Sequence, residues 1–403
     1  MNASATTAPE ATAEVALPSW LTLLLAGACG LIVANIYYAQ PLIGPISGEL
    51  GLSPAAGGLI VTMTQIGYGV GLLLIVPLGD LFENRGLVLA VMGLAVLGVL
   101  AAALSGTAGM FLAASLVIGI GSVAVQVLVP YAAHLAPERA RGQVVGNVMS
   151  GLMLGIMLAR PLASFITSLW SWHLVFLLSA VAMLGLGVVL RLALPARRPA
   201  SARSYGALLV SMAGLARSNV VLRRRALYHA GVFGAFSLFW TATPLLLTGP
   251  QYGFSQQGVA LFALVGVAGA ISAPLAGRVA DRGWTRPATG LAMLAVALSF
   301  LLTRLAEPGS SLALGLLVAA AVLLDFGVSA NVVLGQRAIF SLGAEYRSRL
   351  NGLYMATFFL GGALGSALGG WSYATGGWPL TAWVGLALPV LALLYYATER
   401  RHG

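Results

Sequence analysis

The sequence RLALPARRPASARSYGALLVSMAGLARSNVVLRRR, residues 191–225, lies near the middle of the 403-residue chain and carries eight arginines without a single Asp or Glu. Long apolar runs flank it on both sides. In a chain that crosses a bilayer repeatedly, short Arg-rich loops stay on the cytoplasmic side, because moving guanidinium groups through hydrocarbon is costly. The stretch therefore predicts a cytoplasmic loop that divides a membrane protein into two halves. The alternative, a basic linker between two soluble domains, conflicts with the composition of the rest of the chain.

The chain is 59% hydrophobic and only 8% charged, whereas an ordinary soluble domain has roughly 25% charged residues. Its net charge of +10 comes from arginine alone, because the sequence contains no lysine. Outside the central stretch the arginines form no basic stripe interleaved with aromatic residues, so we expect the lipid bilayer as a partner and no nucleic acid. One cysteine and four dispersed histidines favour neither a disulfide framework nor a metal site. We expect no cofactor, and the lack of lysine rules out the usual ATP-binding loop.

A membrane-spanning helix needs about 20 mostly apolar residues, and the sequence offers twelve such runs. The predicted spans are 20–42, 55–78, 86–105, 108–134, 143–168, 172–194, 226–248, 257–276, 288–303, 311–340, 350–370 and 380–398. Because these runs are continuously apolar and do not alternate, they exclude a membrane β-barrel. The pattern predicts an all-α membrane protein with twelve transmembrane helices in two six-helix bundles.

The predicted domains follow from these spans. We expect a disordered cytoplasmic tail at 1–19, an N-terminal bundle at 20–194, a basic cytoplasmic linker at 195–225, a C-terminal bundle at 226–398 and a cytoplasmic tail at 399–403. With the central loop inside, nineteen of the 21 arginines fall on the inner side. The exceptions are Arg160, within the fifth span, and Arg304, beside an outer turn.

The two halves repeat each other. The segment 39–42 (AQPL) in the first span matches 242–245 (ATPL) in the seventh. Four residues recur in the second half at one constant offset: Leu128, Arg141, Gly155 and Trp172 match Leu334, Arg347, Gly361 and Trp378. Repeats of equal span number and the same orientation are related by an axis along the membrane normal. Such a protein places its solute site between the halves.

The loop between the second and third spans, GDLFENRG at 79–86, resembles the loop motif of the major facilitator superfamily, and GRVADRG at 277–283 is similar to the repeat of that motif in the second half. The resemblance covers the chain from Trp20 onward and implies the fold of that family. It also implies a conformational gate, in which a charged loop holds the facing helix in one state and releases it in another. The gate candidates are Gly79, Asp80, Glu83, Arg85, Gly86, Gly277, Asp281 and Arg282. Glu83 and Asn84 depart from the motif, where the family has Asp and Arg.

Further motifs resemble a bacterial subgroup of efflux-type permeases, the drug:proton antiporter-like members of the family. They are NIYYAQPL at 35–42, LD at 324–325, RSRLN at 347–351 and FLGGALGS at 359–366. The fifth-helix motif of antiporters is half present, since Gly142, Gly151 and Gly155 fall correctly. However, Ile156 replaces its proline, and Ala159 and Arg160 replace its last glycines.

Two charged residues are predicted inside the membrane, where charge is costly and marks a pathway or a paired site. Asp325 is the acid placed deep in a span, and we predict that it carries the coupled proton; a structural pairing, for example with Arg337 or a hydroxyl, is the alternative. Arg160 is a candidate substrate ligand, against the alternative that it extends to the outer headgroups. By resemblance, helices 1, 4, 7 and 10 line the cavity, and the other cavity candidates there are Asn35, Tyr38, Gln126, Trp240 and Asn331. The alternative for each of them is a polar residue that only packs helices together.

These observations predict a multi-pass transporter of the bacterial inner membrane, working by alternating access as a monomer and not as an enzyme. The predicted activity is proton-coupled export of small amphiphilic compounds. One alternative is proton-coupled or facilitated import of an organic solute. An alternative of another class is a transporter-like receptor without flux.

The arginine distribution gives a testable topology. Reporter fusions at Ser204 and at the C-terminus should report a cytoplasmic location, and fusions at Gly51 and Gly253 an external one, because the arginine-rich loops stay inside. Fusions to alkaline phosphatase and to a fluorescent protein would report the two locations. Consistent external signals at Ser204 would contradict this orientation.

Overall fold

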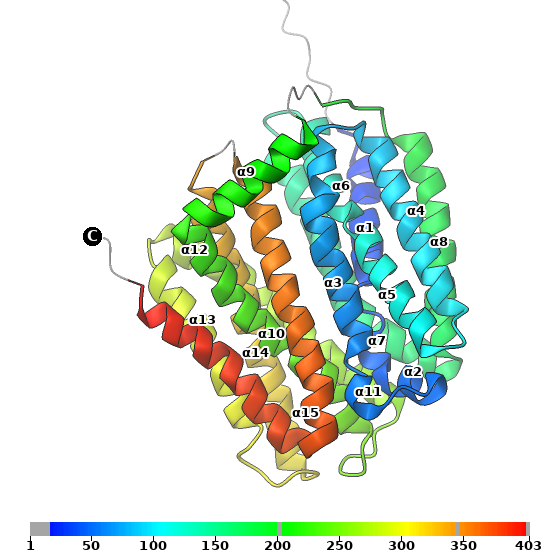
Figure 1. Cartoon of the computed structure of the whole chain (residues 1–403), viewed down its shortest axis with the longest axis vertical. Coiled ribbons are helices and arrows are strands. Elements are labelled where there is room, and N and C mark those ends of the chain that lie inside the picture. Colours follow the sequence, from blue (N-terminus) through cyan, green and yellow to red (C-terminus); the bar gives the residue numbers. More distant parts are fainter. Residues whose placement is uncertain (1–16, 200–203, 344–345, 400–403) are drawn as a thin grey trace, which may run out of the picture.

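The protein is described by a computed structural model over residues 17–199, 204–343 and 346–399. Within these residues every regular element is a helix (Figure 1). Residues 1–16 of the predicted tail, residues 200–203 of the central loop and the end at 400–403 lie outside the described residues.

The N-terminal half lies to the right in Figure 1 and the C-terminal half to the left. The first half contains α1 (Ser19–Ala34), η1 (Gln40–Leu42), α2 (Ile43–Leu50), η2 (Pro54–Ala56), α3 (Leu59–Leu74), η3 (Val76–Asp80), α4 (Asn84–Ala103), α5 (Ala108–Ser122), α6 (Ala124–Leu135), α7 (Arg141–Leu169) and α8 (Trp172–Ala193). The connecting segment contains α9 (Tyr205–Ser218). The second half contains α10 (Val220–Thr248), α11 (Gln256–Ala263), η4 (Leu264–Ile271), α12 (Ser272–Asp281), α13 (Thr285–Leu302), α14 (Ser311–Phe340) and α15 (Arg347–Ala397).

The described helices account for the twelve predicted spans. Nine of them, counted with their short 3-10 extensions and with α5 and α6 taken together, are long and apolar enough to cross a membrane. Among these, α15 contains two spans, because Gly376 and Gly377 leave helical geometry in its interior and Gly377 has a φ of 59°. A positive φ suits a residue without a Cβ. The remaining two spans are interrupted helices, α1–η1–α2 and α11–η4–α12.

The first span is not the continuous helix predicted for 20–42. It leaves α-helical geometry after Ala34, passes through turns and η1, and resumes as α2, which ends at Leu50. Pro41 lies in η1 and Pro45 in α2. Proline has no amide hydrogen to donate and clashes with the preceding helical turn, so these residues explain the interruption. The broken stretch places Tyr37 and Gln40 in the interior of the protein.

Close helix packing within each half repeats in the other. A Cβ added to Gly155 on α7 would lie 2.2 Å from the backbone oxygen of Gly30 on α1. Its counterpart Gly361 on α15 meets the backbone of Ala230 on α10, at 2.4 Å. Small residues let membrane helices approach this closely and gain van der Waals contact. The same helix pair is therefore packed through the same repeat position in both halves.

The central connection is partly helical, which the sequence did not indicate. Ser204 caps the start of α9 by accepting a hydrogen bond from the Ala207 amide, at 3.3 Å. The hydroxyl of Tyr205 donates to the Leu74 carbonyl at the end of α3, at 2.8 Å, and Arg349 at the start of α15 donates to Ser211. This helix crosses one end of the molecule (Figure 1) and contacts both halves. The helix that follows, α10, begins at Val220, earlier than its predicted start at residue 226.

The halves pack tightly at the opposite end, near η2. Thr62 on α3 donates to the Ala363 carbonyl on α15, at 3.0 Å, and Gln65 donates to Ser237 on α10, at 2.5 Å. Between α7 and α11, Ser164 donates to Gln256 at 3.3 Å. In the orientation predicted from the arginines this is the external end, so the structure is closed on that side.

The Gly155 contact predicts a specific loss of stability. Gly155→Ala should lower the free energy of unfolding by about 1–3 kcal/mol, because the added methyl group overlaps the α1 backbone. Thermal unfolding in detergent would measure it. Gly146→Ala on the same helix is the matched control, since a Cβ there has nothing within 4 Å. Equal melting temperatures for the two variants would contradict the packing.

Candidate functional site

Arg160 lies between the two halves of the protein. Its side chain, on α7, is only 4% exposed, and its Nε donates to Oε1 of Gln40 at 2.7 Å. Three aromatic rings face the guanidinium group, with ring centroids 4.8 Å away for Trp240, 5.0 Å for Tyr37 and 5.1 Å for Phe236. Such faces attract a cation electrostatically. The alternative that Arg160 extends to the outer headgroups is therefore wrong for this structure.

Asp325 lies on α14 and is equally buried, with 4% of the residue exposed. Its Oδ1 accepts a hydrogen bond from Nε1 of Trp240, at 3.0 Å. A Cβ added to Gly266 of η4 would lie 2.8 Å from the other carboxyl oxygen, so a larger residue there would displace the acid. The suggested pairing of Asp325 with Arg337 is wrong, because Arg337 forms an ion pair with Asp281.

Trp240 joins the two buried charges. Its ring faces the guanidinium of Arg160 and its N–H donates to Asp325. In the part of the chain that the structure describes, no ion pair within 4.0 Å links the two residues directly, but their charges interact over the longer distance. One charge belongs to the N-terminal half and the other to the C-terminal half, so this contact couples the halves.

A small cavity borders this group. It is lined by Pro41, Arg160, Trp240, Thr243, Pro244, Leu247, Val259, Phe262 and Ala263. Its volume is about 10 Å³, which is at the lower limit for one water molecule. The structure is therefore in a state too closed to hold an organic solute at this point.

Two nitrogen atoms of the Arg160 and Gln40 pair lack hydrogen-bond partners. Among the described side chains, Nη2 of Arg160 and Nε2 of Gln40 are buried and unpaired. Both nitrogens can donate hydrogen bonds but cannot accept them. Leaving a buried donor unsatisfied costs about 1–3 kcal/mol, and more for a charged group, so the site is short of acceptors.

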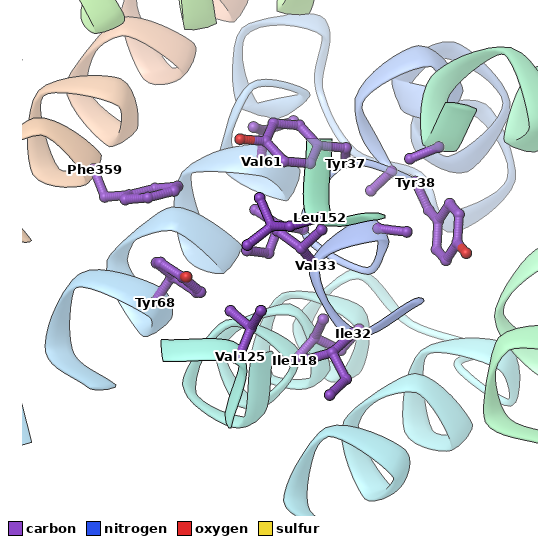
Figure 2. Close-up of a cluster of buried hydrophobic side chains, with 14 of the residues drawn as sticks. Ile32, Val33, Tyr37, Tyr38, Val61, Tyr68, Ile118, Val125, Leu152 and Phe359 are labelled. Carbon is purple, nitrogen blue, oxygen red and sulfur yellow. The ribbon is translucent and has the colours of Figure 1, made fainter. Parts of the chain in front are cut away.

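Tyr37, and not the predicted Tyr38, faces Arg160. Figure 2 shows their rings on opposite sides of the chain, with Tyr37 directed toward Val61 and the side on which Phe359 lies. Tyr38 lies beside Ser179 of α8. The predicted Asn35 is also directed into its own half, since it donates to the Leu31 carbonyl and accepts from Ser179.

Gln126 and Asn331 lie apart from the Arg160 group. Gln126 on α6 donates to the hydroxyl of Tyr68, at 2.9 Å. The Asn331 side-chain oxygen lies 3.1 Å from Nδ1 of His229 on α10, in a buried aromatic environment. Of the predicted cavity residues, the structure brings Arg160, Trp240 and Asp325 together and leaves the other four elsewhere.

The predicted gate in the first half binds its own half. Glu83 caps α4 by accepting from the amides of Arg85 and Gly86, at 2.9 and 2.8 Å. The Arg197 amide donates to it as well, at 3.3 Å, and the Arg85 guanidinium donates to the Leu194 carbonyl. The loop therefore attaches the start of the central connection to α4, which differs from the expected hold on a facing helix.

Other gate candidates take part in local contacts. The Gly79 carbonyl accepts from Asn84, at 2.7 Å, and Asp80 ends η3. In the second half Asp281, at the end of α12, pairs with Arg337 of α14. Gly277 lies on α12 and Arg282 is exposed just after it. The pairing of Asp281 joins two neighbouring helices at the end of the molecule where α9 lies.

Sequence reasoning missed several partners in this site. Gln40 and Tyr37 belong to the NIYYAQPL segment that carried the family resemblance, so that motif offered a signal for both. Phe236 lies four residues before Trp240 and shares its helix face, but in so apolar a helix it gave no separate signal.

A twelve-span, two-half fold with buried opposite charges at the interface defines a membrane transporter. The family model described as "Major Facilitator Superfamily" matches residues 23–316 and 261–403. The chain belongs to that superfamily. It is 38% identical over 377 residues to "Uncharacterized transporter YgaY" of Escherichia coli O157:H7, covering 93% of this chain and 94% of that protein.

Solved structures show the same fold. The nucleoside transporter NupG matches with a TM-score of 0.77 at 13% identity, covering 94% of this chain and 99% of the other. A D-xylose-proton symporter matches with a TM-score of 0.72 at 17% identity, covering 94% and 97%. The chain is thus a multi-pass integral membrane protein and a secondary transporter of this superfamily.

The Glu83 cap predicts a pH-dependent stability. Partial burial disfavours the charged carboxylate, but the amides of Gly86, Arg85 and Arg197 outweigh it and lower the pKa of Glu83. A lowered pKa gives stability that is present above the ordinary glutamate range and lost as pH falls through the folded value. Glu83→Ala should cost about 1 kcal/mol at neutral pH and progressively less in acid.

Thermal unfolding of the detergent-purified protein across pH would measure this difference. Glu138→Ala is the control, since Glu138 is an exposed acid in the next loop on the same predicted side. A loss for Glu83→Ala that stays constant down to acidic pH would mean that the ionised cap is not the stabilising form.

Proposed function

We propose that this protein transports small amphiphilic compounds by alternating access, with a solute site between the halves at Arg160 and with Asp325 carrying a coupled proton. The observation that carries the proposal is the contact described above, in which Trp240 touches both a buried guanidinium and a buried carboxyl group from opposite halves. A structural role alone would be served more cheaply by apolar residues, because desolvating two charges is costly.

Proton binding to Asp325 gives the site a way to change state. An ionised carboxylate resists transfer into a dry environment, whereas the neutral acid does not. Protonation also removes the negative charge that compensates Arg160 across the interface. A proton on Asp325 therefore changes the energy of the contact between the halves, as coupling between a proton gradient and transport requires.

Two candidate functions, export and import, differ in the direction of transport. Resemblance to efflux-type permeases favours export in exchange for protons, and this is the first candidate. Proton-coupled import is a second candidate, favoured by the unpaired donors at Arg160 and Gln40, since these suit an anionic solute that binds together with a proton. An imposed pH gradient distinguishes them by the sign of solute movement.

The proposed setting is the bacterial inner membrane, with both termini, the central connection and α9 on the cytoplasmic side. The arginine distribution supports this orientation. The solute site lies between two halves of one chain, so a monomer suffices, and we propose no nucleic-acid partner. A receptor without flux would show binding but no gradient-driven movement in liposomes.

Asp325→Asn tests the proton assignment. It imitates the neutral acid at nearly constant shape, so it should abolish solute accumulation driven by a pH gradient, while exchange without net proton movement can persist. The measurement is uptake by reconstituted protein with and without the gradient, for a solute selected by thermal shift on the wild type. Glu307→Gln, at an exposed acid in the turn before α14, is the matched control. Gradient-driven accumulation at the wild-type level by well-folded Asp325→Asn would refute the assignment.

A further inference from the structure

We propose that the solute is an organic anion, bound by Arg160 and Gln40, and that its binding is accompanied by uptake of a proton at Asp325. This inference rests on the proposed function and specifies its substrate class and its coupling. It follows from the donors, aromatic faces and charges that meet at one point between the halves.

Arg160 and Gln40 have more hydrogen-bond donors than partners. Arg160 is 4% exposed and uses its Nε on Gln40, while its Nη2 has no partner in the described structure. Gln40 is 1% exposed, its oxygen accepts that bond, and its Nε2 is also unpaired. The hydrogen bond between Arg160 and Gln40 sets the orientation of the Gln40 amide. The unpaired nitrogens of the two residues are therefore available to the same ligand. These two free donors suit a carboxylate or a sulfonate.

Aromatic and aliphatic side chains lie beside these donors. Trp240, Phe236 and Tyr37 surround the guanidinium, and the adjoining cavity wall is formed by Pro41, Leu247, Val259 and other apolar residues. A ligand with an anionic group and an aromatic or aliphatic body matches this arrangement. An organic cation does not, since Arg160 would repel it.

Asp325 is the group that would take up the proton. Arg160 is the charged side chain that shares Trp240 with Asp325, and Tyr37 is the titratable side chain that faces Arg160. The other neighbours are uncharged, with Trp240 donating from α10 and Gly266 contributing only backbone from η4. The positive charge of Arg160 favours the ionised form of Asp325. An anion on Arg160 cancels that charge and so favours the protonated form.

Linkage makes this effect reciprocal. If anion binding promotes protonation of Asp325, protonation strengthens anion binding by the same factor. Anion and proton then bind together, so a gradient that is acidic outside would draw the anion inward. This coupling corresponds to the import candidate, and a site at which solute and proton compete would give the opposite sign.

The test uses the purified full-length protein and isothermal titration in two buffers of different ionisation enthalpy at neutral pH. The probes are benzenesulfonate, benzoate and hexanoate, compared with benzyl alcohol and benzyltrimethylammonium. The expected result is binding of at least one anion, weaker or no binding of the neutral and cationic compounds, and uptake of up to about one proton. Benzenesulfonate stays ionised, so any proton taken up in its binding belongs to the protein.

Variants assign the effect to the proposed residues. Arg160→Gln should weaken anion binding by about tenfold to a hundredfold, as expected for loss of charge-assisted hydrogen bonds. Gln40→Glu keeps the shape of the side chain but should weaken anion binding by a similar factor, because the new carboxylate would pair with the guanidinium of Arg160. Asp325→Asn should still bind the anion but without proton uptake. Arg304→Gln, at an exposed arginine outside the site, should behave as wild type.

Several outcomes would overturn the proposal. These are binding of the cation alone, binding of no anion in the panel, equal anion affinity in wild type and Arg160→Gln, or anion binding without proton uptake. The proposed function fails through a different measurement, gradient-driven accumulation by Asp325→Asn, which would also remove the proton part of this proposal but not the anion site. If the transported solute is a cation and its transport requires Asp325, the proposed proton coupling stands and only the proposed anion site is ruled out.

Discussion

A guanidinium group without access to bulk water must be compensated by the protein, and in this structure the compensation of Arg160 comes from both halves. Gln40 and Tyr37 act from the first half, while Trp240, Phe236 and the charge of Asp325 act from the second. Desolvation of such a charge costs several kcal/mol. The compensation of this charge therefore depends on the relative position of the halves, and in the proposed mechanism a change in the charge changes the balance between conformations.

The remaining architecture supports this contact. The interrupted first span brings Tyr37 and Gln40 to Arg160, which an uninterrupted helix would not do with the same side chains. Glycines on α7 and α15 hold each half together by backbone contact, so that each half can move as a unit. At one end the halves meet through Thr62, Gln65 and Ser164, and at the other α9 contacts both. Rigid halves joined by polar, breakable contacts are suited to rocking about a central site.

The predicted gate motif of the first half makes a contact that differs from the one expected from the family. Glu83, Asn84 and Arg197 fasten the start of the central connection to α4 in this conformation. The departures from the family pattern at Glu83 and Asn84 lie at these contacts. In the second half, the pair between Asp281 and Arg337 is largely exposed, with 48% and 60% of the arginine and aspartate side chains accessible, so water screens it and its contribution to stability is small.

The sequence by itself determined the membrane class, the number of spans, the division into two halves and the two buried charges. These follow from the length of apolar runs, from the arginine loops and from the cost of charge in hydrocarbon, which are properties of local composition. Only the tertiary structure decided that Tyr37 and Gln40 face Arg160 while Tyr38 and Asn35 do not, that Trp240 links Arg160 to Asp325, and that α9 lies across both halves. The physical reason is that a helix whose faces are all apolar carries no periodic signal for its orientation. Which side chain meets which partner is then set by packing between segments far apart in the chain.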